Sequence, residues 1–155
     1  GGHPMAAGFS IESNNISEFS QDFSEYANNN ISEESLLPKI ILDSKMNLSD
    51  ISIRFLKFLD ALEPFGPKNN RPIFGTTNVN VVGNPKVIGK NRDCIKFLAK
   101  QDKTIFEAIG FGLIESYENL ITNKPIDIAY SIGENIWQGE KTVQLEIKDI
   151  RITEN

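Results

Sequence analysis

The chain has very few of the residues that build disulfides and metal centres. Its 155 residues include one cysteine, Cys94, and one histidine, His3. A lone cysteine excludes an internal disulfide and a cysteine-rich zinc site. Two-metal phosphodiester hydrolysis needs several carboxylates, usually with histidines, around ions about 3.5–4 Å apart. The sequence has no Asp-x-Asp, Asp-His-His or His-x-x-x-His cluster, so we expect neither a metal site nor a hydrolytic centre.

Long apolar runs are also missing. No stretch approaches the roughly 20 apolar residues of a membrane span, and no charged-then-apolar leader indicates export. Together with the single Cys94, this predicts a cytoplasmic protein without a membrane partner. A hydrophobic content of 39% and ten phenylalanines predict a globular rather than a disordered chain.

Positive charge is absent from the first part of the chain. Residues 1–38 contain six acidic and no basic side chains, so this part carries −6 and the rest +1 of the net −5. The basic side chains of residues 86–103 outnumber the acidic ones by four; they are Lys86, Lys90, Arg92, Lys96, Lys100 and Lys103. Such a strip attracts a phosphate backbone at modest salt. On charge alone, a solvated hairpin surface is the commoner explanation of such a run.

Helical patterns occupy the first half of the chain. Asn15-Ile16-Ser17-Glu18 has the form of a capping box, and Phe19, Phe23 and Tyr26 follow on one helical face. We interpret this aromatic stripe as core, on a helix that packs against a sheet mostly missing from this chain. Further along, 39–43 is expected to be a short strand, and a helix capped by Ser49 is expected to continue to about residue 62.

From residue 73 onward the pattern is mostly β. Apolar and polar residues alternate as in strands with one buried face. The five predicted strands are 73–82, 86–89 together with 94–100, 104–111, 126–135 and 142–152, and a helical segment at 113–121 separates the third from the fourth. This is the element order of an OB-type barrel, so we expect an α+β, mainly β fold.

Motifs spread over nearly the whole chain carry a family resemblance. Gly1-Gly2-His3-x-x-Ala6-Ala7-Gly8 resembles the Gly-Gly-His motif of the DHH-associated domain in DHH-family phosphoesterases. Later stretches resemble the RecJ-like single-strand-specific exonucleases of that family; they are 62–67, 71–74, 109–112, 127–130, Asn135, Trp137, Gly139, Gln144 and 148–151. The resemblance implies a C-terminal fragment, with a DHH-associated remnant at 1–36 and an OB-fold nucleic-acid-binding domain at 37–155.

The resemblance also implies an activity for the intact protein. It would degrade single-stranded DNA from the 5′ end in recombination and repair, with Mn²⁺ or Mg²⁺ held in a catalytic domain that this chain lacks. The expected role of Gly1, Gly2 and His3 is to touch a substrate phosphate. No catalytic residue and no cofactor are expected here; the fragment would bind single-stranded DNA, without hydrolysis, as a monomer.

Seven side chains are candidates for binding DNA. Lys86, Lys90, Arg92 and Lys96 lie in the region of the second predicted strand, where OB barrels bind nucleic acid. The loop 65–74 adds Lys68 and Arg71, although fastening the preceding helix to the first barrel strand is an alternative role for it. Trp137, at the last hairpin, is either a stacking surface or a lid on the barrel end. Phe97 is expected in the core.

Two other functions stay open. The barrel could instead dock a repair protein, an interpretation that the acidic 1–38 segment favours. A relationship to RNA-processing enzymes with DHH-associated domains is the third interpretation, and the motifs after Phe65 count against it.

Overall fold

The computed structural model describes residues 1–3, 5–137 and 139–154, without the side chains of Ile136, Trp137 and Glu140. The chain divides into two units, Gly1–Lys39 and Ile40–Asn155. Among the described residues no helix has the length and apolarity needed to span a membrane.

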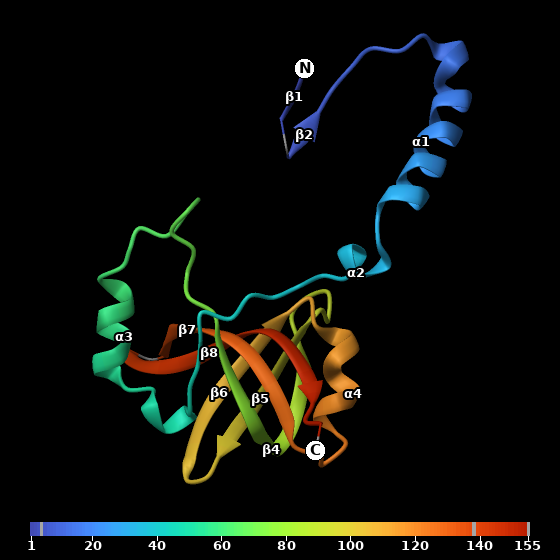
Figure 1. Ribbon diagram of the computed structural model, residues 1–155. Helices are drawn as coiled ribbons and strands as arrows, with labels where there is room; N and C mark the ends of the chain where they lie inside the picture. Colours follow the sequence, from blue (N-terminus) through green and yellow to red (C-terminus); the bar gives the residue numbers. More distant parts are fainter. Residues whose placement is uncertain (4, 138, 155) are drawn as a thin grey trace. The chain divides into compact units, whose positions relative to one another are not determined.

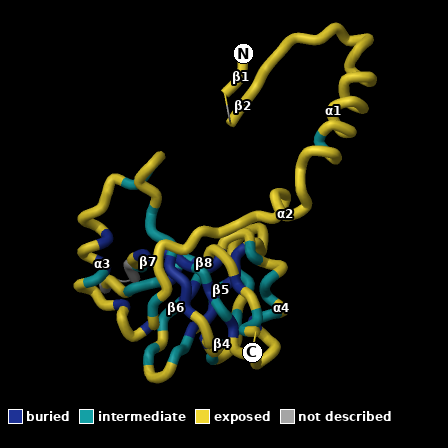
Figure 2. The backbone as a smooth tube through the Cα atoms, viewed as in Figure 1, coloured by how far each residue is buried: buried dark blue, intermediate teal, exposed yellow. Residues whose placement is uncertain are grey.

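The first unit contains little tertiary structure. Its elements are β1 (Gly2–His3), β2 (Ala6–Ala7), η1 (Ser13–Asn15), α1 (Ile16–Asn30) and α2 (Glu33–Leu36). The helix α1 forms where the aromatic spacing predicts it, but none of its residues is buried, so the aromatic stripe is not core within this chain (Figure 2). The predicted capping box is wrong: Asn15 makes no side-chain cap bond, because the preceding η1 turn holds it in the αR conformation rather than the extended one that a cap needs.

The second unit is a closed five-stranded barrel. It contains β3 (Ser44–Lys45), η2 (Leu48–Asp50), α3 (Ile53–Asp60), β4 (Phe74–Ile88), β5 (Cys94–Gln101), β6 (Thr104–Phe111), η3 (Ile114–Ser116), α4 (Tyr117–Leu120), β7 (Ile126–Trp137) and β8 (Glu140–Ile152) (Figure 1). The order of the barrel strands is β4-β5-β6-β8-β7, and β7 pairs with β4 to close the barrel. The predicted mainly-β, OB-type fold is therefore confirmed.

The core lies inside the barrel. Inward-facing side chains such as Val79, Ile95, Phe97, Ile132 and Leu145 are each at most 3% exposed, which confirms the prediction for Phe97. A buried polar pair completes it.

Tyr130 and Thr76 form that pair, their hydroxyl oxygens 2.8 Å apart. Thr76 also lies 2.8 Å from the Met46 carbonyl, to which it donates a hydrogen bond. Burial raises the pKa of Tyr130 to about 12.

Three predicted boundaries are wrong. The helix α3 begins after Ser52, whose side chain accepts a hydrogen bond from the Phe55 amide at 3.1 Å. Ser49 instead lies within η2, in a capping box between Asn47 and Asp50. The short strand is 44–45 rather than 39–43, and the Asp43 carboxylate accepts a hydrogen bond from the Ile73 amide.

The third error concerns Lys86. The stretch Gly83-Asn84-Pro85 does not end the first barrel strand, and β4 continues to Ile88 across a register shift between Val82 and Lys86. A bulge accommodates the positive φ of Gly83 and the missing amide hydrogen of Pro85. Lys86 therefore belongs to the first barrel strand and not to the second.

Candidate nucleic-acid interface

One outward surface of the barrel alternates basic and apolar side chains. On β5 the inward residues Ile95, Phe97 and Ala99 are buried, so the residues between them point outward. Strand pairing places Lys86 opposite Lys96. We call this surface the β5–β6 face; its members are Lys86, Lys96, Leu98, Lys100, Ile105, Glu107, Ile109 and Phe111.

The four predicted basic residues lie on this face or at its end. Lys86 and Lys96 face outward from adjacent strands. Lys90 and Arg92 are exposed in the turn between β4 and β5, where the Arg92 amide donates a hydrogen bond to the Gly89 carbonyl at 3.2 Å. The structure thus gathers four positive charges around one edge of the β5–β6 face.

A carboxylate lies near the middle of the face. Glu107 pairs with Lys96 at 2.7 Å. It also accepts hydrogen bonds from the amide side chains of Gln144 at 2.6 Å and Asn135 at 3.4 Å. This Glu107 cluster links β5, β6, β7 and β8, and it partly neutralises Lys96.

Two hollows share the Lys96–Glu107 pair as a common wall. One extends over β4 and β5, where Val82, Lys86 and Leu98 line it. The other reaches β7, β8 and the start of α3, where Ile53 and Asn135 line it. The outer surface is therefore hollowed from β4 to β8, which suits an extended ligand.

The loop that contains Lys68 and Arg71 has a different arrangement. The Arg71 guanidinium lies over the Phe65 ring at 4.7 Å, and it donates hydrogen bonds to Glu63 and to the Ile132 carbonyl, both at 3.2 Å. These contacts fasten the loop to β7, the fourth barrel strand, whereas the alternative role names the first. Lys68 is exposed, in the left-handed conformation with φ 69°.

The remaining predicted residues lie elsewhere. Trp137 ends β7, and its side chain is outside the described residues, so the choice between stacking and lid stays a prediction. Gly2 and His3 form β1 in the first unit, pair with Ala6–Ala7 and are exposed. The Gly1 amino group donates a hydrogen bond to the Gly8 carbonyl at 3.2 Å.

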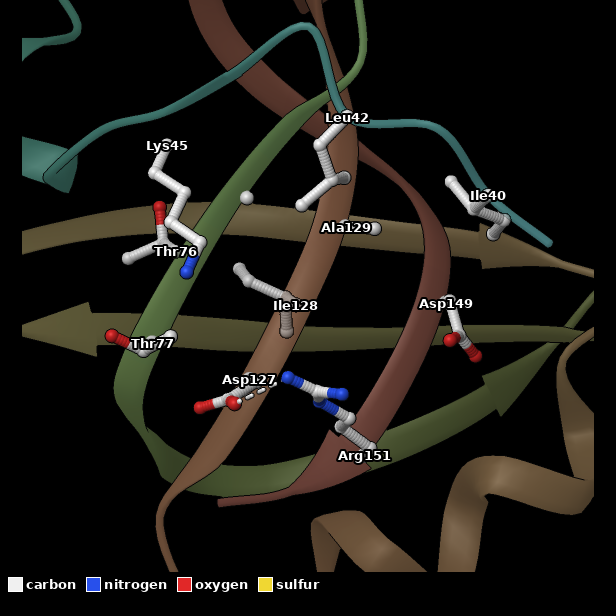
Figure 3. A pocket seen from close by; sticks show the side chains of 11 residues that line it. Ile40, Leu42, Lys45, Thr76, Thr77, Asp127, Ile128, Ala129, Asp149 and Arg151 are labelled. Atoms are coloured by element: carbon white, nitrogen blue, oxygen red, sulfur yellow. Dashed lines mark hydrogen bonds and ion pairs between the residues drawn. The ribbon is translucent and has the colours of Figure 1, made fainter. Parts of the chain in front are cut away.

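A second hollow region lies where the incoming segment crosses the barrel (Figure 3). It is a pocket of about 170 Å³ between Ile40, Leu42 and Lys45 and the strands β4, β7 and β8. A Cβ on Gly75 would lie 2.6 Å from a methyl group of Leu42, so glycine permits this close crossing.

One charged side chain of this pocket, that of Asp127, has its partners within the chain. Asp127 pairs with Arg151 at 3.3 Å and accepts hydrogen bonds from the Thr153 hydroxyl and the Asn78 amide. These bonds join β7 to β8, to the end of the chain after β8 and to β4, and they occupy the Asp127 carboxylate. Among residues 1–3, 5–137 and 139–154, no group of three or more His, Cys, Asp or Glu side chains is arranged to hold a metal ion.

The sequence reasoning missed one exposed aromatic on the β5–β6 face. Phe111 ends β6 and is 69% exposed. The signal was available, because Phe111 shares the period-two phase of Ile105 and Glu107 and lies between two glycines. The sequence interpretation includes it only within the 109–112 motif.

Comparison with known proteins identifies the family of this barrel. The RecJ OB domain family matches residues 42–149. A single-stranded-DNA-specific exonuclease RecJ of Bacillus subtilis (strain 168) is 29% identical over 154 residues, which are 99% of this chain and 20% of that protein. The RecJ of Haemophilus influenzae is 25% identical over 94% of this chain and 25% of its own length. The predicted relationship is confirmed, and the chain spans about a fifth to a quarter of these relatives.

A solved structure has the same fold. RecJ from Thermus thermophilus, crystallised with Mn²⁺, superposes with a TM-score of 0.77 and 20% identity, covering all of this chain and 22% of that one. The Mg²⁺ complex of the same protein gives a TM-score of 0.67 at 16% identity, with 95% and 22% of the two chains covered.

Proposed function

Since the chain belongs to the RecJ OB domain family, we propose that it is the part of a single-stranded-DNA-specific exonuclease that grips the strand. The single observation that carries the proposal is the clustering of Lys86, Lys90, Arg92 and Lys96 at the β5–β6 face. OB folds bind oligonucleotides on the face of their second and third strands and on the adjoining loops. Here those strands are β5 and β6.

The chemistry of the face suits a single strand. Cationic side chains attract phosphates, and exposed apolar side chains such as Leu98 and Ile105 meet the flat surfaces of bases. Duplex DNA keeps its bases stacked inside, so it gains only the charge interaction. Preference for single strands is the expected result.

The role of the intact protein is part of the same proposal. It would degrade single-stranded DNA from the 5′ end in recombination and repair, in the bacterial cytoplasm where its DNA lies. Its Mn²⁺ or Mg²⁺ would be held by a catalytic domain outside this chain, as the metals in the Thermus thermophilus complexes suggest. Residues 1–36 would be the end of a DHH-associated domain, with Gly1, Gly2 and His3 touching a substrate phosphate.

Fluorescence anisotropy of labelled oligonucleotides at about 50 mM salt tests the binding. We expect a labelled oligothymidine to bind with micromolar affinity and a duplex of equal length to bind several-fold more weakly. Equal affinity for both, or no binding to either, would contradict the proposal.

Charge reversal of the turn identifies the surface. The double variant Lys90→Glu/Arg92→Glu should bind oligothymidine at least tenfold more weakly, with a shallower dependence of affinity on salt, because two phosphate contacts are lost. The matched control is Lys45→Glu/Lys124→Glu, which reverses two exposed charges elsewhere in the same unit. Equal losses in both variants would indicate a response to net charge alone.

A docking role for a repair protein is the second candidate. In it the barrel is the docking surface, and the acidic segment 1–38 favours it. If the Lys90→Glu/Arg92→Glu variant keeps oligonucleotide binding but loses a repair partner in pull-down, docking is supported. The oligomeric state is a separate prediction: we expect the chain to sediment as a monomer.

A further inference from the structure

We propose that Phe111 is a base-stacking residue, which fixes where on the β5–β6 face a single strand lies. The inference rests on the proposed function and makes it specific. Phe74 of β4 and Phe97 of β5 are buried, whereas Phe111 is 69% exposed at the end of β6. Burying a flat apolar ring of this size against a ligand would lower the free energy, because its surface would be removed from water.

The backbone holds the ring in a defined place. Phe111 pairs with Cys94 across the sheet, and the next amide, that of Gly112, donates a hydrogen bond to the Asp93 carbonyl at 2.8 Å. The strands β5 and β6 lie side by side through this point (Figure 1). An aromatic ring on a fixed strand end loses little conformational entropy on binding, unlike one on a mobile loop.

The surroundings leave the ring open to a ligand. Both neighbours in sequence are glycines, and a Cβ on Gly112 would meet nothing within 4 Å. No aromatic pair or cation–π contact involves Phe111 among the residues that the structure describes.

Charge complementarity selects nucleic acid as the occupant. The Gly112–Asp93 bond brings the end of β6 against the β4–β5 turn, which contains Lys90 and Arg92. A stacked base and cations for its flanking phosphates are the two parts of a single-strand site.

The test removes the ring and the base separately. The full chain and its Phe111→Ala variant are titrated with oligothymidine and with an abasic strand of equal length. Phe111→Ala should weaken oligothymidine binding by about tenfold, within the range of one stacked base, and leave abasic binding unchanged. Phe111→Trp should bind oligothymidine at least as tightly as the unaltered chain.

A matched control removes another exposed ring. Phe58 is 59% exposed on α3 and is not a member of the β5–β6 face, and Phe58→Ala should change neither affinity. If Phe111→Ala binds oligothymidine like the unaltered chain, or loses equal affinity for both strands, the stacking role is wrong while the proposed function stands. If the unaltered chain binds neither strand, both fail.

Discussion

The β5–β6 face contains both basic side chains, which attract DNA, and the carboxylate of Glu107, which repels it. Lys96 is paired with Glu107 at 2.7 Å, so its charge is not fully available to a phosphate. The same carboxylate accepts hydrogen bonds from Gln144 and Asn135. A glutamate in this position lowers the positive charge of the face while it holds the two amide side chains in place.

Replacing this carboxylate should strengthen DNA binding. In Glu107→Gln the side-chain carbonyl can still accept from Gln144, while Lys96 becomes free to contact a phosphate. We expect oligothymidine to bind about three- to tenfold more tightly at 50 mM salt, with a steeper salt dependence. Salt titrations by anisotropy measure both quantities.

The control for this variant is Glu118→Gln, which removes one exposed carboxylate from α4. It changes the net charge equally but lies outside the β5–β6 face. An equal gain in affinity from Glu118→Gln would mean that overall charge, and not the Glu107 cluster, limits binding.

At the scale of elements, helix starts depend on backbone conformation as much as on residue type. By residue type, both Ser49 and Ser52 could cap a helix, with the side-chain oxygen accepting a hydrogen bond from the backbone amide three residues later. Only Ser52 begins a helix as its cap, with the extended conformation φ −135° and ψ 163° from which its hydroxyl reaches the Phe55 amide. The difference comes from η2, which contains Ser49 and which the Asn47–Asp50 capping box holds in place.

This difference predicts unequal effects of two similar substitutions. Ser52→Ala should lower the free energy of unfolding by about 1 kcal/mol, because the cap bond of α3 is lost. Ser49→Ala should change it by less than about 0.5 kcal/mol, as for an ordinary exposed site. Urea unfolding of both variants measures the effects, and similar values for the two would contradict the assignment of Ser52 as the cap.

At the scale of the whole molecule, the two units differ in how they are stabilised. The barrel has a closed sheet and a continuous core, whereas the first unit has no buried residue among those that the structure describes (Figure 2). Hydrophobic burial is the main stabilising contribution to a domain. The barrel should therefore fold without the first unit.

Deletion of residues 1–39 tests this independence. The remaining 40–155 should unfold cooperatively in urea with a midpoint close to that of the full chain, because no core contact is lost. A large fall in the midpoint, or loss of cooperativity, would show that the first unit supports the barrel. Oligothymidine binding should persist, since the β5–β6 face is intact.

Much of this protein could be predicted from its sequence. Alternation along 142–152 and 104–111 predicts strands with one buried face, because period is a local property. The prediction of the barrel itself depends mainly on the family resemblance. The family motifs are local as well. Sequence and residue type also suffice to place Lys86, Lys90, Arg92 and Lys96 near one another, although the same pattern assigns Lys86 to the wrong strand.

The tertiary structure alone decided how these residues are used. Whether Gly83-Asn84-Pro85 ends a strand or forms a bulge depends on the partner strand, and the bulge sets Lys86 opposite Lys96. The Glu107 cluster joins side chains from four strands, and the loop role of Arg71 depends on the Ile132 carbonyl, 61 residues away. Contacts between distant segments arise only when the sheet closes, and no local pattern encodes them.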